Sequence, residues 1–203
     1  MVGKLILFIV GATFLFQGTQ PKVILFFGDS LTAGYGLSPE EAFPAVVEKS
    51  LQKAGAQARI INAGLSGETS AGGLSRIDWV LRQPMDVFVL ELGANDGLRG
   101  LPIRDTQKNL QTIIDKVIFK YPKCKIVLAG MMVPPNMGKE YADSFKRLFG
   151  EIAIKNNAVL IPFLLDGVAG IERLNQPDGI HPTSEGHKII GENISKIIYP
   201  LVH

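Results

Sequence analysis

Apolar and polar positions alternate in blocks along most of the chain. Residues 23–27 form a continuous apolar run closed by Gly28, which is the pattern of a strand buried on both faces. Residues 106–120 carry apolar side chains at three- and four-residue steps, as one face of a helix does, and Pro122 prevents that helix from continuing. A second such helix is predicted over residues 184–199. Further short apolar runs predict strands at residues 59–62, 87–91, 125–129 and 159–161.

Strands that alternate with helices imply a parallel sheet whose crossover helices cover both faces. The chain has 203 residues, a length that fits one domain. No internal repeat, low-complexity tract or long linker divides it. We therefore predict a single doubly wound α/β domain over residues 21–203.

The first twenty residues have a different character from the rest. Residues 5–16 are an uninterrupted apolar run, and Lys4 is the only charged residue of residues 1–20. A bilayer-spanning helix needs about 20 such residues, whereas the core of a secretory signal needs about 7–15. Residues 1–20 are therefore predicted to be a signal peptide that exports the protein to the periplasm or the medium. The alternatives are an uncleaved N-terminal anchor or a hydrophobic first strand, because no A-x-A cleavage triplet follows.

The amino-acid composition limits which partners, metals and cofactors the protein is expected to use. Apolar residues make up 46% of the chain and charged residues 20%, which excludes a disordered protein. The net charge is +2 with no basic block, so we expect no nucleic-acid partner. The single Cys124 cannot close an internal disulfide, and with only three histidines we expect neither a metal site nor a cofactor. Cys124 itself is predicted to be a small buried hydrophobe.

In a doubly wound sheet, ligands bind outside the carboxyl ends of the strands. The segments that follow the predicted strands carry small residues, hydroxyls, one amide and a carboxylate–imidazole pair. They contain no dinucleotide fingerprint, because Pro39 stands where the third glycine belongs, and no phosphate-binding loop. The nucleophile elbow G-x-S-x-G is also absent around Ser66. The segments are residues 28–36, 64–69, 92–97 and 178–182.

Acyl transfer needs a nucleophile, a base and a group that orients the base. Ser30 is the best candidate nucleophile, since it directly follows a buried strand and Gly28 lets the backbone turn sharply. Ser66 and Ser70 are alternatives in the next loop. Taken alone, a serine in such a turn is more often a cap or a turn hydroxyl than a nucleophile.

His181 is the most plausible base. Asp178 precedes it by three residues on a short loop, where the carboxylate could hold Nδ1 and leave Nε2 to face a nucleophile. An Asp-Gly pair is otherwise an ordinary turn. His187 is interpreted instead as a helix residue half-buried in packing.

An oxyanion requires donors that point to one place. The backbone N–H groups of Ser30 and Gly67 and the side-chain amide of Asn95 could converge there, since each follows a different strand. Asn95 alone would be interpreted as a turn-forming amide.

These four segments together resemble the blocks of a known family, the SGNH hydrolases or GDSL esterase/lipase family. The resemblance spans most of residues 22–183. Within the family, the chain is similar to the branch of multifunctional thioesterases, lysophospholipases and arylesterases. The blocks are Gly28-Asp29-Ser30-Leu31, the stretch Ser66-Gly67-Glu68-Thr69-Ser70, Gly93-x-Asn95-Asp96 and Asp178-x-x-His181.

The resemblance implies a flavodoxin-like three-layer α/β/α sandwich with a central parallel sheet of about five strands and metal-free hydrolysis. Ser30 would be the nucleophile, His181 the base and Asp178 its orienting group. Ser30, Gly67 and Asn95 would supply the oxyanion donors.

The function expected from this reading is two-step hydrolysis of short- to medium-chain esters or thioesters by a monomer, with a small-molecule and possibly lipid-derived substrate. Deacetylation of a sugar or cell-envelope polymer by the same residues is the alternative, and a non-catalytic binding domain is a third hypothesis. The base is further expected to be held loosely until substrate binds. Candidates for an apolar acyl groove are Leu98, Leu101, Met131, Met132, Val133 and Met137, some of which are expected to be core residues.

Overall fold

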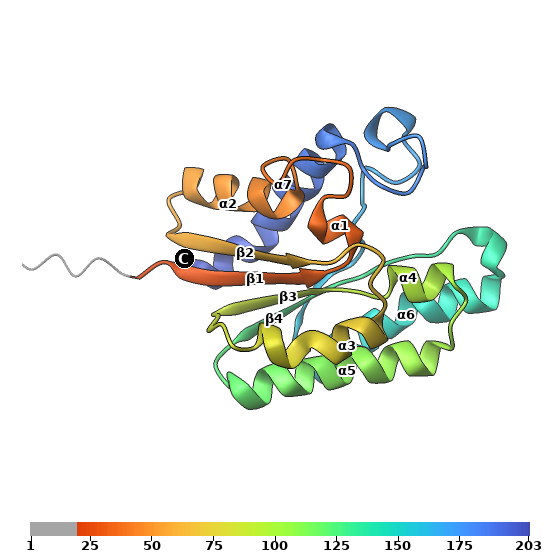
Figure 1. The fold of residues 1–203 in the computed structure, drawn as a ribbon, viewed down its shortest axis with the longest axis horizontal. Helices are drawn as coiled ribbons and strands as arrows, with labels where there is room; N and C mark the ends of the chain where they lie inside the picture. The colour runs from red at the N-terminus through yellow and green to blue at the C-terminus, as the bar shows by residue number, and fades with distance from the viewer. Residues whose placement is uncertain (1–19) are drawn as a thin grey trace, which may run out of the picture.

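The computed structural model describes residues 20–203 and arranges them as a five-stranded parallel sheet between two layers of helices (Figure 1). Every predicted strand is present. The spatial order of the strands is β2-β1-β3-β4-β5, so the chain starts near the middle, moves to one edge and then crosses back to the other. The strands are β1 (Lys22–Gly28), β2 (Ala58–Gly64), β3 (Val87–Glu91), β4 (Lys125–Ala129) and β5 (Val159–Ile161).

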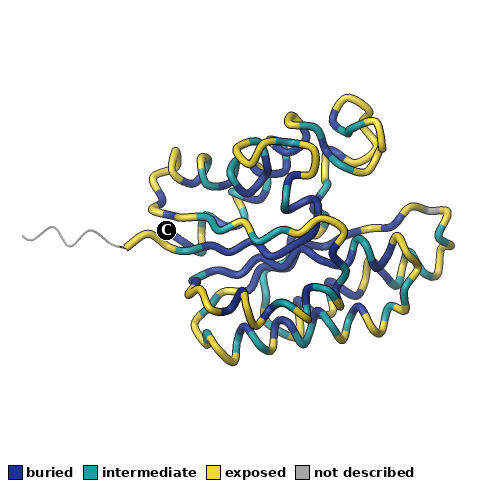
Figure 2. Tube along the Cα trace, viewed as in Figure 1, coloured by how far each residue is buried: buried dark blue, intermediate teal, exposed yellow. Residues whose placement is uncertain are grey.

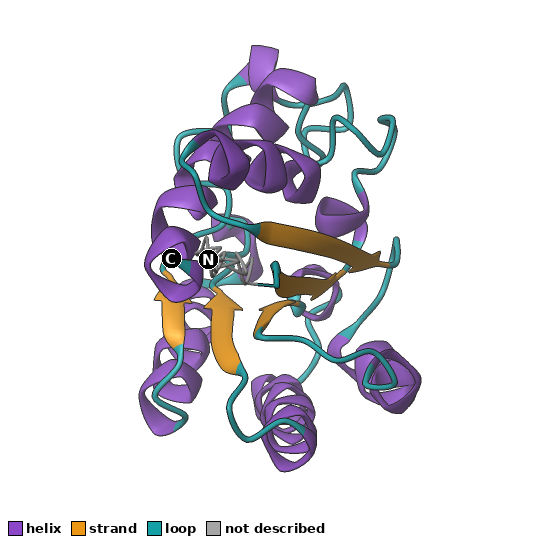
Figure 3. Ribbon diagram, turned by 90° about the vertical axis from the view of Figure 1, so that its left-hand side faces the viewer, coloured by secondary structure: helices purple, strands orange, loops and turns teal. Residues whose placement is uncertain are grey.

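Helices cover both faces of the sheet, as crossover connections between parallel strands require (Figures 1 and 3). One layer contains α1, α2 and α7, and the opposite layer contains α3, α4, α5 and α6. The helices are α1 (Ser30–Ala33), α2 (Phe43–Lys53), α3 (Ser70–Val80), α4 (Ala94–Leu98), α5 (Ile103–Lys120), α6 (Lys139–Lys155) and α7 (Ser184–Val202). Two short 3₁₀ turns are Pro135–Met137 and Glu172–Leu174.

The core lies on both sides of the central strands. All five residues of β3 are buried, as are the last five of β1, and Figure 2 shows these strands as the darkest part of the tube. The two strands pair in register from Ile24 opposite Val87 to Gly28 opposite Glu91. Because a strand between two helix layers has no solvent-facing side, its sequence is continuously apolar rather than alternating.

Two helix boundaries differ from the prediction. Helix α5 begins at Ile103, after Pro102 at its N-cap. The three residues that follow Ile103 are polar, so the apolar period becomes visible only a turn later. Helix α7 continues to Val202, three residues beyond the predicted end at residue 199, and contains Pro200. Proline removes one backbone hydrogen bond, and Val202 is buried beyond it, so packing favours the extra turn.

Within residues 20–203 no helix combines the length and apolarity needed to span a bilayer. The predicted export segment of residues 1–20 lies almost wholly outside the described residues, so it stays a prediction.

Two side chains are buried differently from the prediction. His187 was expected to be half-buried, but its exposure is only 1%: its ring stacks on Phe43, and its Nδ1 accepts the Phe43 N–H at 3.1 Å. Cys124 was expected to be buried but is half-buried at the start of β4. Burial and the nearby Asp86 carboxylate raise the pKa of the Cys124 thiol to about 12, which keeps it unreactive at neutral pH.

The burial of His187 predicts a pH dependence of stability. Burial lowers the pKa of His187 to about 4 from an ordinary 6.5, so the unfolded chain takes up a proton at this residue first as the pH falls. Stability is therefore lost between about pH 6.5 and pH 4, by up to about 3 kcal/mol at 1.36 kcal/mol for each pKa unit. The His187→Asn variant keeps an acceptor for the Phe43 N–H and should lose less stability over this range, as measured by urea unfolding at pH 7 and pH 4.5.

The matched control is His187→Leu, which leaves the Phe43 N–H unpaired and should be destabilised at both pH values. An Asn variant with the same acid sensitivity as the unmodified protein would assign that sensitivity to other groups.

Candidate active site

The carboxyl ends of three neighbouring strands meet at one edge of the sheet. Gly28 ends β1, and it pairs with Gly64 at the end of β2 on one side and with Glu91 at the end of β3 on the other. Space is so tight here that a Cβ on Gly28 would lie 2.1 Å from Thr32 Oγ1, and one on Gly64 would lie 2.3 Å from the Ala33 nitrogen. Both glycines are therefore needed for α1 to sit directly on the strand ends.

Ser30 is the first residue of α1 and is held tightly. The preceding Asp29 is the N-cap, and its Oδ1 accepts the Leu31 N–H at 3.0 Å, as a helix-capping carboxylate does. Ser30 is 9% exposed. A buried strand and a capped turn thus fix the backbone that carries this hydroxyl.

Three side chains form a continuous chain of hydrogen bonds across this edge. Ser30 Oγ lies 3.0 Å from His181 Nε2, and His181 Nδ1 lies 2.7 Å from Asp178 Oδ2. The bond to His181, aided by the backbone N–H groups of His181 and Ile180, lowers the pKa of Asp178 to about 2. An ionised carboxylate can only accept, so the neutral imidazole carries its hydrogen on Nδ1 and leaves Nε2 free to accept from the serine hydroxyl.

The loop that carries His181 is tied to the loop that carries Ser30. Gln176 N–H donates to the His181 carbonyl at 2.7 Å, and Gln176 Nε2 donates to the Tyr35 carbonyl at 2.8 Å. The Tyr35 ring lies 4.5 Å from the His181 ring. Sequence reasoning missed both Tyr35 and Gln176, although Tyr35 follows Ser30 by only five residues in a glycine-flanked turn. These contacts set the imidazole opposite the hydroxyl.

The three candidate oxyanion donors are near one another but differ in availability. Ser30 N–H belongs to the first turn of a helix, whose N–H groups have no partner within the helix. Gly67 has a φ of 78°, and its N–H makes no hydrogen bond within residues 20–203. The Asn95 amide is already occupied, since Nδ2 donates to Asp29 Oδ2 at 3.0 Å and to the Glu68 carbonyl at 3.1 Å.

The alternative serines are placed differently from Ser30. Ser66 is exposed in the turn after β2. Ser70 is fully buried, and its Oγ donates to Asp96 Oδ1 at 2.5 Å while accepting from Asn109. Because Asp96 also accepts from Thr106, this carboxylate fastens α3 and α5 to α4.

Asp29 and Glu91 are two buried carboxyl groups directly beneath the Ser30 turn. Glu91 Oε2 accepts the Asp29 N–H at 3.2 Å and the Thr32 hydroxyl at 2.7 Å. Burial raises the pKa of Asp29 to about 6, although bonds from Leu31 and Asn95 oppose that shift. Burial and the neighbouring Asp29 raise the pKa of Glu91 well above its ordinary value. The sequence correctly predicts Glu91 as the last residue of a strand, but sequence reasoning gave it no role at the site.

The candidate acyl-groove residues divide into two groups. Met131 and Val133 are buried in the core, and Val133 packs against Gly97. Leu98 is exposed, and Leu101 and Met137 are half-buried. Met132 is exposed and lines a hollow beside α7. Large exposed apolar side chains also lie on the loops that carry the candidate residues: Tyr35, Leu65, Leu98 and Ile180.

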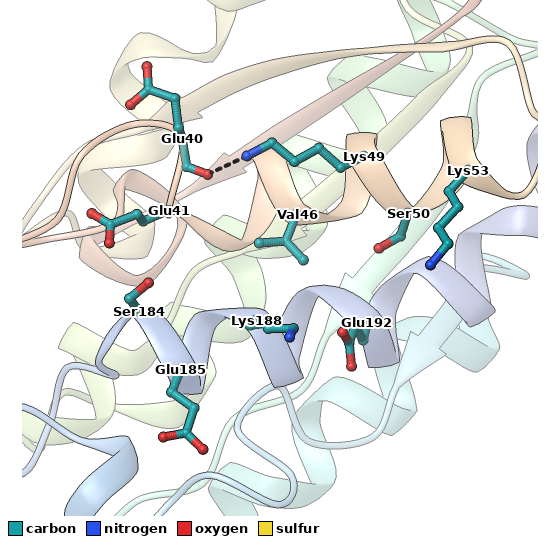
Figure 4. Close-up of a pocket in the computed structure, with 10 residues that line it drawn as sticks. All are labelled: Glu40, Glu41, Val46, Lys49, Ser50, Lys53, Ser184, Glu185, Lys188 and Glu192. Atoms are coloured by element: carbon teal, nitrogen blue, oxygen red, sulfur yellow. Dashed lines mark hydrogen bonds between the residues drawn. The ribbon is translucent and has the colours of Figure 1, made fainter.

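A hollow of about 630 Å³ lies elsewhere, between α2 and α7 (Figure 4). Charged side chains of both signs line most of it, and Lys49 Nζ is bound to the Glu40 carbonyl at 3.1 Å. It contains none of Ser30, Asp178 and His181. Within residues 20–203 no group of three His, Cys, Asp or Glu side chains is placed to hold a metal ion.

Comparisons with known proteins agree with the geometry. Residues 26–189 match the model of the GDSL-like lipase/acylhydrolase family. The chain is 36% identical to esterase TesA of Pseudomonas aeruginosa over 189 residues, which cover 93% of each protein. It is 34% identical to thioesterase 1/protease 1/lysophospholipase L1 of Escherichia coli K12, with 97% of this chain and 92% of that protein covered.

Solved structures give the same result. A crystal structure of TesA superimposes with a TM-score of 0.84 at 37% identity, and it covers 89% of this chain and 99% of that one. The three-layer α/β/α fold implied by the resemblance is thereby confirmed. The chain belongs to the GDSL-like lipase/acylhydrolase family and is a carboxylic ester hydrolase of that family.

Proposed function

We propose that the protein hydrolyses short- to medium-chain esters and thioesters through an acyl-enzyme formed on Ser30. The observation that carries this proposal is the unbroken chain of hydrogen bonds from Asp178 through His181 to Ser30. Nucleophile, base and orienting group are defined by such geometry and not by their order in the chain.

In the first step Ser30 Oγ attacks the carbonyl carbon while His181 Nε2 takes the hydroxyl proton. Asp178 remains ionised and stabilises the imidazolium that forms. His181 then gives the proton to the departing alcohol or thiol, which leaves an acyl group on Ser30. Water, deprotonated by His181, then attacks the acyl carbon. The bond from that carbon to Ser30 Oγ breaks, His181 returns the proton to Ser30 Oγ, and the carboxylic acid leaves.

The tetrahedral oxyanion would be held by the N–H groups of Ser30 and Gly67 and by the Asn95 amide. The first two donate no hydrogen bond within residues 20–203. Asn95 would have to share a hydrogen that Asp29 or the Glu68 carbonyl accepts in the free protein. We expect this rearrangement to accompany formation of the oxyanion.

The exposed apolar side chains Leu65, Leu98 and Ile180 favour an acyl chain over a sugar as the group next to Ser30. We further propose that the protein acts as a monomer outside the cytoplasm, the location being inferred from the apolar run of residues 5–16.

Ser30→Ala should lower kcat/KM for p-nitrophenyl butyrate by about 10³–10⁶, because removal of the nucleophile disables the three groups as a unit. The same variant should no longer be labelled by a fluorophosphonate probe. Ser66→Ala, which removes an exposed hydroxyl from the neighbouring loop, is the matched control and should keep both properties. Normal turnover by Ser30→Ala would remove Ser30 from this role.

Asn95→Ala should lower kcat by about 10²–10³ with a smaller change in KM, because the donor acts on charge that develops in the transition state. Asn109→Ala removes another amide of the same region, one that donates to Ser70 Oγ, and should leave kcat close to that of the unmodified protein. Equal effects of the two substitutions on kcat would point to loss of structure and not of an oxyanion donor.

The preferred acyl group can be measured directly. We expect kcat/KM for p-nitrophenyl octanoate to exceed the value for the acetate, since each buried CH₂ contributes about 0.8 kcal/mol. An acetylated glycan should be a poor substrate. A clear preference for the glycan would instead support a polymer deacetylase that uses the same residues.

A further inference from the structure

Glu91 is a buried ionisable side chain that contacts the Ser30 turn, and the reaction proposed above gives it no role. It ends β3 with 0% exposure. Its Oε2 accepts two hydrogen bonds, from the Asp29 N–H and the Thr32 hydroxyl, and so spans the first residues of the Ser30 turn. Its Oε1 is buried and has no hydrogen-bond partner among the described residues.

Within residues 20–203 Glu91 forms no ion pair, so only hydrogen bonds would compensate a negative charge on it. From the turn above it comes Asp29, another carboxyl group, whose backbone N–H donates to Glu91 Oε2 at 3.2 Å. Arg76 of α3 reaches the Gly28 carbonyl at the end of β1, but its guanidinium is bound to both carboxylate oxygens of Glu68. An isolated buried carboxylate is far less stable than its neutral acid, so such groups take up a proton.

The carboxyl groups of Asp29 and Glu91 differ in how their oxygens are hydrogen-bonded. Asp29 accepts from the Leu31 N–H and from the Asn95 amide, one bond on each oxygen. Both bonds on Glu91 fall on one oxygen, and the other oxygen has none. When two carboxyl groups lie close together in a protein interior, one of them takes the proton. The contacts place the negative charge on Asp29 and the proton on Glu91.

We propose that Glu91 is held as the uncharged acid and acts as a positioning residue for Ser30 and Asn95. Through Oε2 it fixes the backbone of Asp29 and the side chain of Thr32, and hence the turn that presents the Ser30 hydroxyl. By remaining neutral it leaves the charge on Asp29, which orients the Asn95 amide. The effect on turnover rests on the ester hydrolase mechanism proposed above, whereas the charge state of Glu91 does not.

The test compares Glu91→Gln with Glu91→Leu. Glutamine is the neutral isostere of the protonated acid, and its carbonyl can accept from both the Asp29 N–H and the Thr32 hydroxyl. Leucine has a similar volume but leaves these donors unpaired. At pH 7.5 we expect Gln to retain most of kcat and Leu to lose about tenfold or more, in line with an unpaired buried donor. KM should change little in either variant.

Turnover is expressed per active site titrated with a fluorophosphonate, so that a misfolded fraction does not count as lost kcat. Equal losses of kcat in Gln and Leu would mean that the turn requires a carboxylate, and would overturn the proposal.

Stability gives an independent measurement of the charge state. The unfolded chain loses the Glu91 proton near the ordinary value of 4.5, whereas the folded protein keeps it because burial raises the pKa of Glu91. Stability at this residue therefore falls as the pH rises above 4.5, and glutamine removes that loss. The melting temperature of Glu91→Gln should match the unmodified protein near pH 4.5 and exceed it by about 3 °C or more at pH 8.

The matched control is Glu68→Gln. Glu68 is also buried, but it forms a bidentate ion pair with Arg76. Removal of one partner of a buried ion pair is destabilising, so this variant should melt below the unmodified protein at pH 8, opposite in sign to Glu91→Gln. A lower melting temperature of Glu91→Gln at pH 8 would mean an ionised Glu91 and would overturn the proposal even if Leu fails to fold. Failure of the hydrolase mechanism would appear separately, as ester turnover that survives Ser30→Ala.

Discussion

The close approach of helix α1 to the ends of β1, β2 and β3 is the constraint on which the rest of the site depends. Two of the three strands end in glycine, because a Cβ on Gly28 or Gly64 would overlap atoms of α1. Protein interiors are packed so closely that such overlaps cannot be absorbed without moving backbone. The hydroxyl of Ser30 is thus placed by the sheet itself, and the other groups of the site are arranged around a fixed point.

The candidate base reaches this point by a different route. Asp178 and His181 lie on a loop between the short 3₁₀ turn at residues 172–174 and α7, and not directly on a strand. Their position comes from hydrogen bonds of Gln176 to the His181 carbonyl and to the Tyr35 carbonyl, which link the two loops. Gln176, which has no chemical role in the proposed mechanism, therefore couples the candidate base to the candidate nucleophile. Positioning by a few loop contacts is also what would let the imidazole move when an acyl group occupies Ser30.

A feature of the fold or of the site can be predicted from the sequence when it depends on residues that are close together in the chain. The strands could be predicted because a fully buried strand is continuously apolar, and Ser30 and His181 because each sits in a short pattern next to a recognisable element. The start of α5 could not be predicted, since three polar residues follow Ile103 in its first turn and only Pro102 marks the boundary. Neither could the burial of His187, whose partner Phe43 is 144 residues away in the chain.

Glu91 shows the same limit at the site. In the sequence it is the polar residue that follows an apolar run, which is typical of a strand end at the surface. Its complete burial results from α1 lying across that end, a contact between residues 59 apart in the chain. The double engagement of the Asn95 amide depends in the same way on Asp29 and Glu68, each from another loop. Properties of the site that arise from crossings between loops are visible only in three dimensions.

This edge of the sheet places four carboxyl groups in the interior, and it stabilises each of them by different means. Glu68 has a cation, Arg76, whose guanidinium also lies 4.2 Å from the centre of a phenylalanine ring of β1. Asp96 has no cation but accepts from Ser70 and Thr106. Asp29 and Glu91 share the least support, and they lie nearest to Ser30.

Because burial of a charge is tolerated only where donors or a counter-charge compensate it, these arrangements are not interchangeable. A proton on Glu91 is the arrangement that lets the turn above it keep a charged Asp29 without a cation. A lysine or arginine in that place would also neutralise the pair, but it would bring a mobile positive charge close to the Ser30 turn and to the imidazole that we propose takes the Ser30 proton. A neutral acid fixes the turn by hydrogen bonds alone and adds no charge of its own to the field at His181.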